Sequence, residues 1–288
     1  MKSLRIQAPG TCGELIQGRF GGHEQLVSFA IDRYSTATFT DQASMTGPPL
    51  SAKTQMARRL FEQRYQVSDR HLTITMATDI PIGKGMASST ADILAVLAGM
   101  GLWHKIPLTA DDLAQMACQI EPSDSIMFKD WTLFDHIRGQ AVESFTMLED
   151  LEVLVLEMDH VVDTKQLRAS GVFDSAHKPE HSRSLSYLRQ ASSKRDYHAL
   201  GRAIITSACE NQMVLAKPHL EELIDLALQN KLWGMNTAHS GTVVGAVYSP
   251  SVGDIERFTA LAQAKGYLKA YPKRAKQGFI AGGPKVIG

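Results

Sequence analysis

The sequence has few cysteines, and none of them is placed as a redox or zinc motif requires. Cys12, Cys118 and Cys209 are far apart, they are odd in number, and the chain contains no CxxC pair. Zinc sites and dithiol motifs need paired cysteines at short spacing. We therefore expect the three thiols to be buried small hydrophobic groups of a protein in a reducing compartment.

An excess of one charge and a long hydrophobic run are also missing. The 30 Lys and Arg residues balance 30 Asp and Glu residues, whereas general nucleic-acid binders normally carry a basic excess. The longest strongly apolar run, residues 93–103, is too short to cross a bilayer, and residues 1–6 lack the apolar centre of a signal peptide. These absences predict a cytoplasmic small-molecule enzyme with no nucleic-acid or membrane partner, and they leave its oligomeric state open.

The pattern of hydrophobic residues and turn residues predicts a mixed α/β chain. Residues 1–40 are typical of β structure interrupted by glycine turns, including one at Pro9-Gly10. Thr109 resembles the start of a capping box, and Gly234 and Gly266 are expected after the ends of helices. Helices are expected at 55–66, 92–101, 109–120, 184–215, 219–232 and 254–265, and strands at 72–76, 151–157, 235–248 and 278–281. A change in character near residue 150 predicts two domains, 1–150 and 151–288.

The most informative segment is a small-residue loop, residues 81–91, that runs from a predicted strand into a predicted helix. Its sequence is PIGKGMASSTA, which is neither a Walker A loop nor a GxGxxG motif. The free N–H groups and the macrodipole of a helix N-terminus attract anions, and glycines let the backbone approach a phosphate closely. The segment therefore predicts a phosphate site; the alternative is a serine that caps the helix among small packing neighbours.

Two more segments accompany this loop in a fixed order. Residues 8–18 read APGTCGELIQG, and residues 236–245 read NTAHSGTVVG. Together the three segments resemble the GHMP kinases over essentially the full length. The resemblance implies a two-lobed α/β (α+β) GHMP kinase fold, with an N-terminal domain like domain 2 of ribosomal protein S5 and a ferredoxin-like C-terminal domain. ATP and the substrate are then expected between the lobes.

Further segments narrow the resemblance within that family. Residues 12–18, 84–92, 121–125, 133–136 and 238–241 look like those of the L-threonine kinases of cobalamin biosynthesis. This resemblance implies transfer of a phosphoryl group from ATP, with Mg²⁺, to L-threonine, giving O-phospho-L-threonine for the aminopropanol linker of cobalamin. A homoserine or other small-alcohol kinase, and a catalytically inactive ligand sensor of the same fold, remain alternatives.

The resemblance also implies roles for particular residues. Asp124 is the expected general base, with a turn or helix-cap role as the alternative, and Glu14 is expected to hold the substrate ammonium. Lys84 is either a point charge beside the phosphates or a solvated loop lysine, and His239 is either a ligand contact or a structural histidine. The residues expected to hold the ATP phosphates are Pro81, Ile82, Gly83, Lys84, Gly85, Met86, Ala87, Ser88, Ser89, Thr90 and Ala91. Mg²⁺ is expected at Ser89 (or Ser88) and Glu121, although Glu121 could instead be a plain carboxylate at a helix end. The substrate is expected to contact Glu14, Asp135 and His136, and the loop is expected to be supported by His239, Ser240 and Gly241.

Two positions depart from the family pattern. Thr11 stands where some members carry a Lys or Arg that pairs with the catalytic aspartate, so this position supplies no cation to Asp124. Ala87 replaces a glycine of the loop, and a positive φ at an alanine would be strained.

Overall fold

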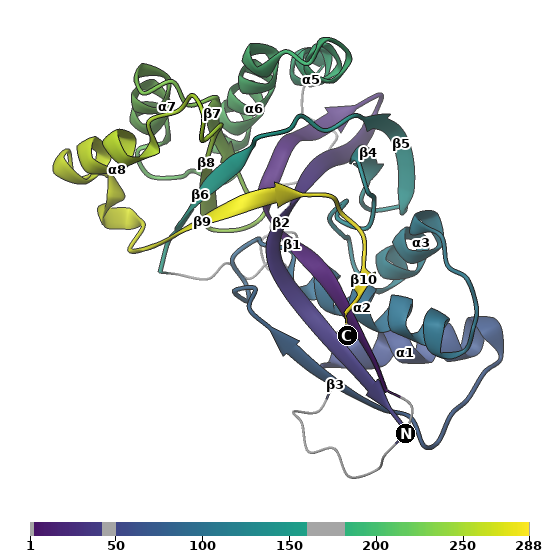
Figure 1. Cartoon of the computed structure of the whole chain (residues 1–288). Helices are drawn as coiled ribbons and strands as arrows, with labels where there is room; N and C mark the ends of the chain where they lie inside the picture. The colour runs from purple at the N-terminus through teal and green to yellow at the C-terminus, as the bar shows by residue number, and fades with distance from the viewer. Residues whose placement is uncertain (1–2, 42–49, 160–181, 288) are drawn as a thin grey trace.

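One long hairpin organises the computed structural model, which describes residues 3–41, 50–159 and 182–287. Strand β1 (Ser3–Phe20) pairs antiparallel with strand β2 (His23–Thr40), and this hairpin crosses the molecule diagonally in Figure 1. Gly21 and Gly22 form the two-residue turn, both with the positive φ that such a turn requires. The expected turn at Pro9-Gly10 is wrong, because the chain continues as β1 and only the pairing register shifts there.

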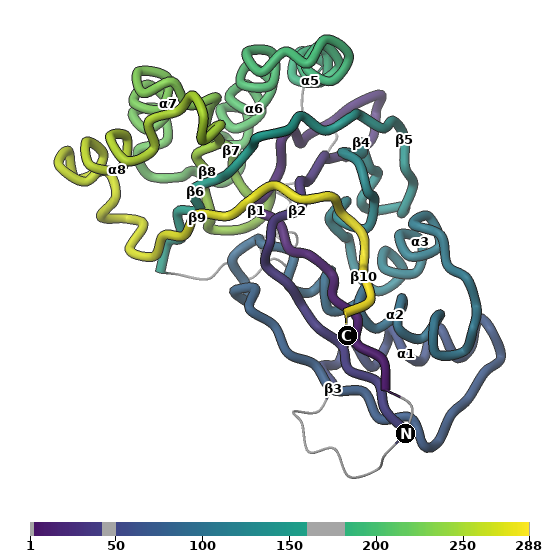
Figure 2. Tube along the Cα trace, in the orientation of Figure 1, coloured from purple at the N-terminus to yellow at the C-terminus, as the bar shows by residue number. Residues whose placement is uncertain are grey.

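Within the described residues, ten strands form a single sheet. Its order is β10-β1-β7-β8-β6-β9-β2-β4-β5, and β3 pairs with β2 off this path. The last strand pairs with the first, with Ile6 opposite Val286, so the two ends of the chain run side by side (Figure 2). The other strands are β3 (Thr73–Thr78), β4 (Trp131–Asp135), β5 (Gln140–Phe145), β6 (Glu152–Glu157), β7 (Gly234–Thr237), β8 (Val243–Tyr248), β9 (Lys273–Ile280) and β10 (Lys285–Val286).

The helices lie in two groups, one toward each end of the hairpin (Figure 1). Helix α2 packs against α1, α3 and the β1–β2 hairpin, and this burial explains why its sequence is apolar on nearly every side. The first group is α1 (Ala52–Tyr65), α2 (Ser88–Trp103) and α3 (Ala110–Ile120); the second is α5 (Ser182–Lys194), α6 (Tyr197–Gln212), α7 (Leu220–Gln229), α8 (Ile255–Ala264) and the short 3₁₀ helix η2 (Tyr267–Ala270).

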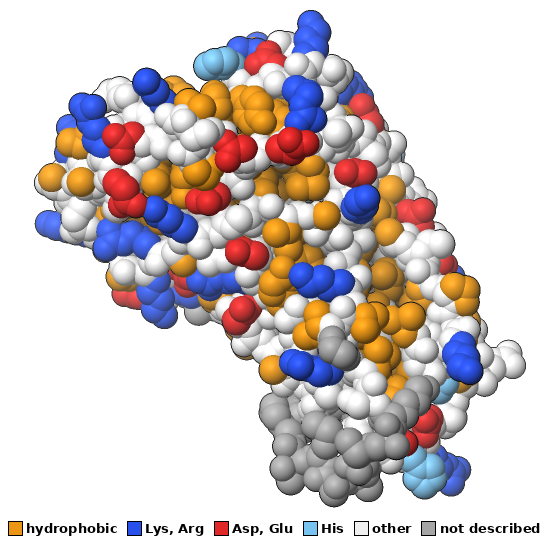
Figure 3. Space-filling model, viewed as in Figure 1, with side chains coloured by type: hydrophobic (Ala, Val, Ile, Leu, Met, Phe, Trp, Pro, Cys, Tyr) orange, Lys and Arg blue, Asp and Glu red, His pale blue; other side chains and the backbone are white. Residues whose placement is uncertain are grey.

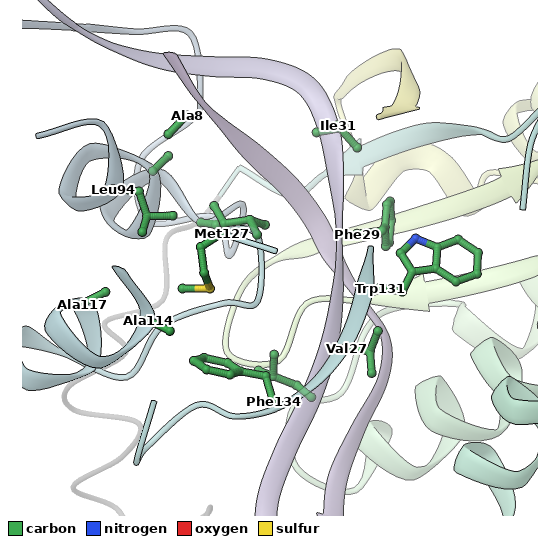
Figure 4. Close-up of a cluster of buried hydrophobic side chains, with 14 of the residues drawn as sticks. Ala8, Val27, Phe29, Ile31, Leu94, Ala114, Ala117, Met127, Trp131 and Phe134 are labelled. Carbon is green, nitrogen blue, oxygen red and sulfur yellow. The ribbon is translucent and has the colours of Figure 1, made fainter. Parts of the chain in front are cut away.

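Hydrophobic side chains are packed on both faces of β2 (Figure 4). Leu94 of α2, Ala114 of α3 and Phe134 of β4 lie on one side. On the other side Phe29 stacks on Phe279 of β9, with 4.1 Å between the ring centroids. A second buried cluster lies among α7, α8, β6 and β8. The hairpin is therefore fixed from both sides, which makes it a rigid support for residues that it presents.

Most of the predicted elements are present, and three details are corrected. The capping box is confirmed, since Thr109 and Asp112 cap each other's backbone N–H groups at the start of α3. Gly266 follows α8 with a φ of 80°, as predicted. Gly234 is not a helix terminator, because α7 already ends at Gln229 and Gly234 lies in β7. Strands β4 and β5 were not predicted, and the expected strand 235–248 is two strands joined by a loop.

The prediction of buried cysteines is partly confirmed, whereas the prediction of two domains is not tested. All three cysteines are free, and Cys12 is buried as predicted, but the prediction is wrong for Cys209, which is exposed. The division into residues 1–150 and 151–288 stays a prediction; the sheet runs across it.

Charge of neither sign dominates the face shown in Figure 3. Lys, Arg, Asp and Glu side chains are interspersed over α7 and α8, and hydrophobic side chains gather along the middle of this face. This face therefore lacks the extended basic surface typical of nucleic-acid binders.

Candidate active site

The three motif segments meet where β1, the glycine-rich loop and the β7–β8 loop come together. The N–H of Thr11 donates to the carbonyl of Met86 at 3.1 Å, and the N–H of Thr242 donates to the carbonyl of Lys84 at 2.9 Å. A Cβ on Gly241 would lie only 2.2 Å from the Lys84 carbonyl oxygen, so no larger residue fits there. The backbone itself, more than side chains, holds the three segments together.

The glycine-rich loop leads directly into α2 through a strained alanine. Gly83, Gly85 and Ala87 all have positive φ, of 72°, 79° and 59°. Ala87 is the N-cap of α2, and its side chain makes no capping hydrogen bond, so the alternative interpretation, a serine that caps this helix, is wrong. Ser88 is instead the first residue of the helix, where backbone N–H groups have no partner within the helix. The left-handed conformation at Ala87 costs about 1–2 kcal/mol relative to a right-handed one.

A cavity of about 440 Å³ lies beside the N-terminus of α2. Thirteen of the predicted site residues line it: Glu14, Ile82, Gly83, Gly85, Ala87, Ser88, Ser89, Thr90, Glu121, Asp124, His136, His239 and Ser240. Its wall also contains Lys53 of α1, which sequence reasoning did not select. Pro81, Lys84, Met86, Ala91, Asp135 and Gly241 are outside this lining. The structure thus brings residues from all three motif segments to one hollow.

The side chain of Lys84 turns away from this cavity. It is 6% exposed, and its ammonium donates to the carbonyl oxygens of Met158 and Asp159 at 2.5 and 2.9 Å. Neither expectation therefore describes it: the lysine is not solvated, and its charge is directed at the segment after β6. It ties the glycine-rich loop to β6, which fixes the position of the loop.

Asp135 is a turn residue, which corrects its expected place in the substrate pocket. Its carboxylate accepts hydrogen bonds from the N–H groups of Ile137 and Arg138, at 3.1 and 2.8 Å, in the turn between β4 and β5. The neighbouring His136 does face the cavity. Its imidazole is buried, and Nε2 lies 3.7 Å from a carboxylate oxygen of Glu24.

Glu14, which is buried, and Asp124, which is half-buried, form a pair of carboxyl groups at the cavity wall. Burial raises the pKa of both groups, and the negative charge of Asp124 raises that of Glu14 further. The two side chains are in hydrogen-bond contact, and Thr90 donates from Oγ1 to Asp124 at 3.2 Å. The contact between the two carboxyl groups raises the pKa of Glu14 and lowers that of Asp124, so Glu14 is the member of the pair that binds a proton more readily.

A buried lysine interacts electrostatically with Glu14. Lys217, in the segment between α6 and α7, is 3% exposed and donates from Nζ to the carbonyl of Leu215 at 3.1 Å. Burial lowers the pKa of Lys217 to about 8, and the Glu14 carboxylate acts in the opposite direction. Lys217 also lowers the pKa of Glu14. It is a cation for Glu14, supplied from a position other than Thr11.

A hydrogen-bonded chain fixes Glu14 from the side of the third motif. The backbone N–H of His239 donates to Glu14 Oε2 at 2.8 Å, and the His239 ring contacts Gln17 Oε1 at 2.7 Å. Asn211 of α6 donates to the same Gln17 oxygen. Gln17 and Asn211 therefore connect α6 to the cavity wall.

Glu121 lies at the mouth of the cavity between a hydroxyl and an ammonium. Its Oε1 accepts a hydrogen bond from Ser89 at the start of α2, and its Oε2 forms an ion pair with Lys53 at the start of α1. Among the described residues, no group of three or more His, Cys, Asp or Glu side chains is arranged as a metal site.

Comparison with known proteins assigns this geometry to a family. Residues 52–128 match the GHMP kinases N terminal domain. The chain is 32% identical to the L-threonine kinase of Citrobacter freundii, over 97% of this chain and 98% of that protein. It is also 32% identical to the L-threonine kinase of Salmonella typhimurium, over 97% of this chain and 94% of that protein. The chain belongs to the GHMP kinase family.

The fold agrees with that membership. The homoserine kinase of Cytophaga hutchinsonii superposes with a TM-score of 0.72 at 16% identity, covering 100% of this chain and 98% of that one. The predicted GHMP kinase fold and the prediction of a kinase are confirmed, and a kinase of this family uses ATP. No helix in the three described ranges has the length and apolarity to cross a membrane.

The side chains at the GHMP kinase cavity fit Mg²⁺. Mg²⁺ prefers oxygen ligands and is usually held by one or two protein oxygens, phosphate oxygens and water. Ser89 and Glu121 supply a hydroxyl and a carboxylate oxygen beside the helix N-terminus expected to hold phosphate. Two protein donors match that coordination, and a closed set of protein ligands is not required.

Sequence reasoning missed three residues of the site: Lys53, Lys217 and Gln17. Each owes its position to packing between distant segments, and Lys53 and Lys217 belong to none of the motif segments. The signal for Gln17 was its place in the first motif segment.

Proposed function

We propose that this GHMP kinase transfers the γ-phosphoryl group of ATP to the side-chain hydroxyl of L-threonine, forming O-phospho-L-threonine for the aminopropanol linker of cobalamin. The observation that carries the proposal is the 32% identity to L-threonine kinases over nearly the whole of both chains. The free state of all three cysteines agrees with the cytoplasmic location that we also propose.

The glycine-rich loop and the first turn of α2 are proposed to hold the ATP phosphates. Backbone N–H groups from Gly83 to Ser89 and the positive end of the helix macrodipole favour negative charge at this end of the cavity. Gly241 and Lys84 hold the loop from behind. Ser89 and Glu121 would ligate Mg²⁺, which offsets phosphate charge in phosphoryl transfer.

Asp124 is the proposed general base. The threonine hydroxyl oxygen forms a bond to the γ-phosphorus, the bond from that phosphorus to the β-bridging oxygen breaks, and the hydroxyl proton moves to Asp124. The raised pKa of Asp124 makes it a stronger base than an ordinary aspartate. The hydrogen bonds from Thr90 and Glu14 fix its orientation.

Glu14 is the proposed partner of the substrate ammonium. It is buried at the cavity wall and is in hydrogen-bond contact with Asp124. An ammonium beside Glu14 favours its ionised form, as any nearby cation does. His136, on the same wall, is a second proposed substrate contact.

A panel of hydroxyl substrates tests the proposal. Purified protein is mixed with ATP, Mg²⁺ and one of L-threonine, L-serine, L-homoserine or mevalonate, and ADP release is followed. We expect the highest kcat/KM with L-threonine. A preference for L-homoserine would show that the protein is a homoserine kinase and would contradict the proposal. Nucleotide binding without ADP release in any mixture would identify a ligand sensor.

A further inference from the structure

Lys53 occupies a position that helix stability does not explain. It is in the first turn of α1, where the macrodipole disfavours a cation, and that turn contains no acidic residue. The helix start itself is fixed by Ser51, whose hydroxyl accepts from the N–H of Thr54. The Lys53 backbone is thus well placed, while its half-exposed side chain reaches the cavity.

The charges around Lys53 come from two other elements. Glu121, at the end of α3, forms the ion pair with its ammonium, and Asp92 of α2 is close enough for Lys53 to lower its pKa. Asp92 also accepts a hydrogen bond from Ser35 of β2. Glu121 is therefore the partner that directs Lys53 toward the start of α2.

Glu121 has both carboxylate oxygens engaged, one by Ser89 and one by Lys53. A carboxylate oxygen that ligates Mg²⁺ cannot keep an undiminished ion pair with a lysine, because the two cations repel each other. The lysine then needs another anion. Asp92 is already engaged by Ser35 and does not line the cavity, so ATP phosphates bound at the start of α2 would supply that anion.

We propose that Lys53 is a nucleotide-binding residue that donates to a phosphate oxygen of ATP, and that Glu121 exchanges Lys53 for Mg²⁺ when the nucleotide binds. The proposal rests on the assignment of Ser89 and Glu121 as Mg²⁺ ligands. Lysine binds phosphate as a point charge on a flexible stem, which suits a side chain that changes partners. Lys53 then couples the nucleotide site to the metal site.

Direct binding of ATP, without threonine, tests this exchange. ATP affinity is measured by calorimetry for wild type, Lys53→Met and Lys53→Arg, once with Mg²⁺ and once with EDTA. In EDTA, Lys53→Met leaves the Glu121 carboxylate facing the phosphates, so we expect affinity to fall by about tenfold to a hundredfold. With Mg²⁺, Glu121 is neutralised by the metal, so the loss should be clearly smaller, but Lys53→Met should still bind ATP less tightly than wild type because the bond from the lysine to the phosphate is gone. Lys53→Arg should keep most of the affinity.

Two further variants make the test specific. Arg59→Met removes one positive charge from an exposed position of the same helix, outside the cavity lining, and should bind ATP like wild type in both buffers. In a Glu121→Gln background the EDTA penalty of Lys53→Met should shrink, because the repelling carboxylate is gone.

Three results would overturn the proposal: Lys53→Met binding ATP as well as Arg59→Met does, an equal loss in both buffers, or an unchanged penalty in the Glu121→Gln background. A wrong substrate assignment leaves every one of these measurements unaffected, because threonine is absent from the assay. If Glu121→Gln does not alter the Mg²⁺ dependence of binding, the metal assignment fails separately.

Discussion

Replacing Lys217 by methionine tests whether a buried charge is kept for function at the expense of stability. Burial lowers the pKa of the 3% exposed Lys217 from its ordinary 10.5 to about 8. At about 1.36 kcal/mol per pKa unit this difference corresponds to about 3.4 kcal/mol against the protonated amine in the folded state. Methionine fills a similar volume without the charge but leaves the Leu215 carbonyl without its donor. We therefore expect Lys217→Met to raise the free energy of unfolding at pH 7 by about 1–3 kcal/mol.

The pH dependence of stability gives the same test a second readout. Below pH 8 the Lys217 amine is protonated in both the folded and the unfolded chain, so the full penalty acts. Between pH 8 and 10.5 the folded protein releases this proton first, so the unfolded chain binds more protons and stability rises with pH. Lys217→Met should lack this rise. Tyr248 and Tyr271, whose pKa values burial raises, titrate alike in both proteins and cancel in the comparison.

Urea unfolding at pH 7 and pH 9.5, followed by circular dichroism, measures both effects. Turnover should respond as well: without this cation the pKa of Glu14 rises further, so the acid limb of the kcat/KM profile, which requires an ionised Glu14 to hold the substrate ammonium, should move to higher pH. Lys194→Met, at an exposed position of α5, is the matched control and should leave both properties unchanged. A Lys217→Met protein that is less stable than wild type at pH 7, with an unaltered pH dependence, would refute the reasoning.

Two other substitutions test the base and the loop. Asp124→Asn should lower kcat by about a hundredfold to ten-thousandfold with little change in ATP affinity, because only the proton acceptor is lost. Steady-state kinetics measure this loss, and a fully active variant would show that Asp124 is not the base. The acid limb of wild-type kcat should lie above the ordinary range of aspartate, because burial raises the pKa of this group. Ala87→Gly should raise stability by about 0.5–1 kcal/mol in thermal unfolding, since glycine adopts the observed φ of 59° without strain but has more entropy to lose; a decrease would show that the strain is absent.

The phosphate end of the site could be predicted because local sequence carries it. The loop at 81–91 could be predicted from the sequence alone, because its features depend only on residues close together in the chain. These features are glycines that need a positive φ, serines at the start of a helix, and the apolar helix that follows. The strain at Ala87 could be foreseen for the same reason: an alanine stood where the turn requires glycine.

The residues that sequence reasoning misplaced depend on distant partners. Lys84 was expected in the cavity or in solvent, but its acceptors are the carbonyls of Met158 and Asp159, beyond the next several elements of the chain. Lys217 becomes a cation of the site only because α6 packs against β1 and the segment that follows this helix brings the ammonium near Glu14. The prediction for Asp135 was wrong for the opposite reason, because two backbone N–H groups of the adjacent turn donate to its carboxylate.

The most direct test of the proposed activity is to identify the product. The protein is incubated with ATP, Mg²⁺ and L-threonine, with Asp124→Asn as a parallel sample, and the mixture is examined by ³¹P NMR and mass spectrometry. We predict O-phospho-L-threonine formed in equal amount to ADP by wild type, and at least about a hundredfold more slowly by Asp124→Asn. ADP without phosphothreonine, or a phosphorylated product from homoserine but none from threonine, would contradict the assignment.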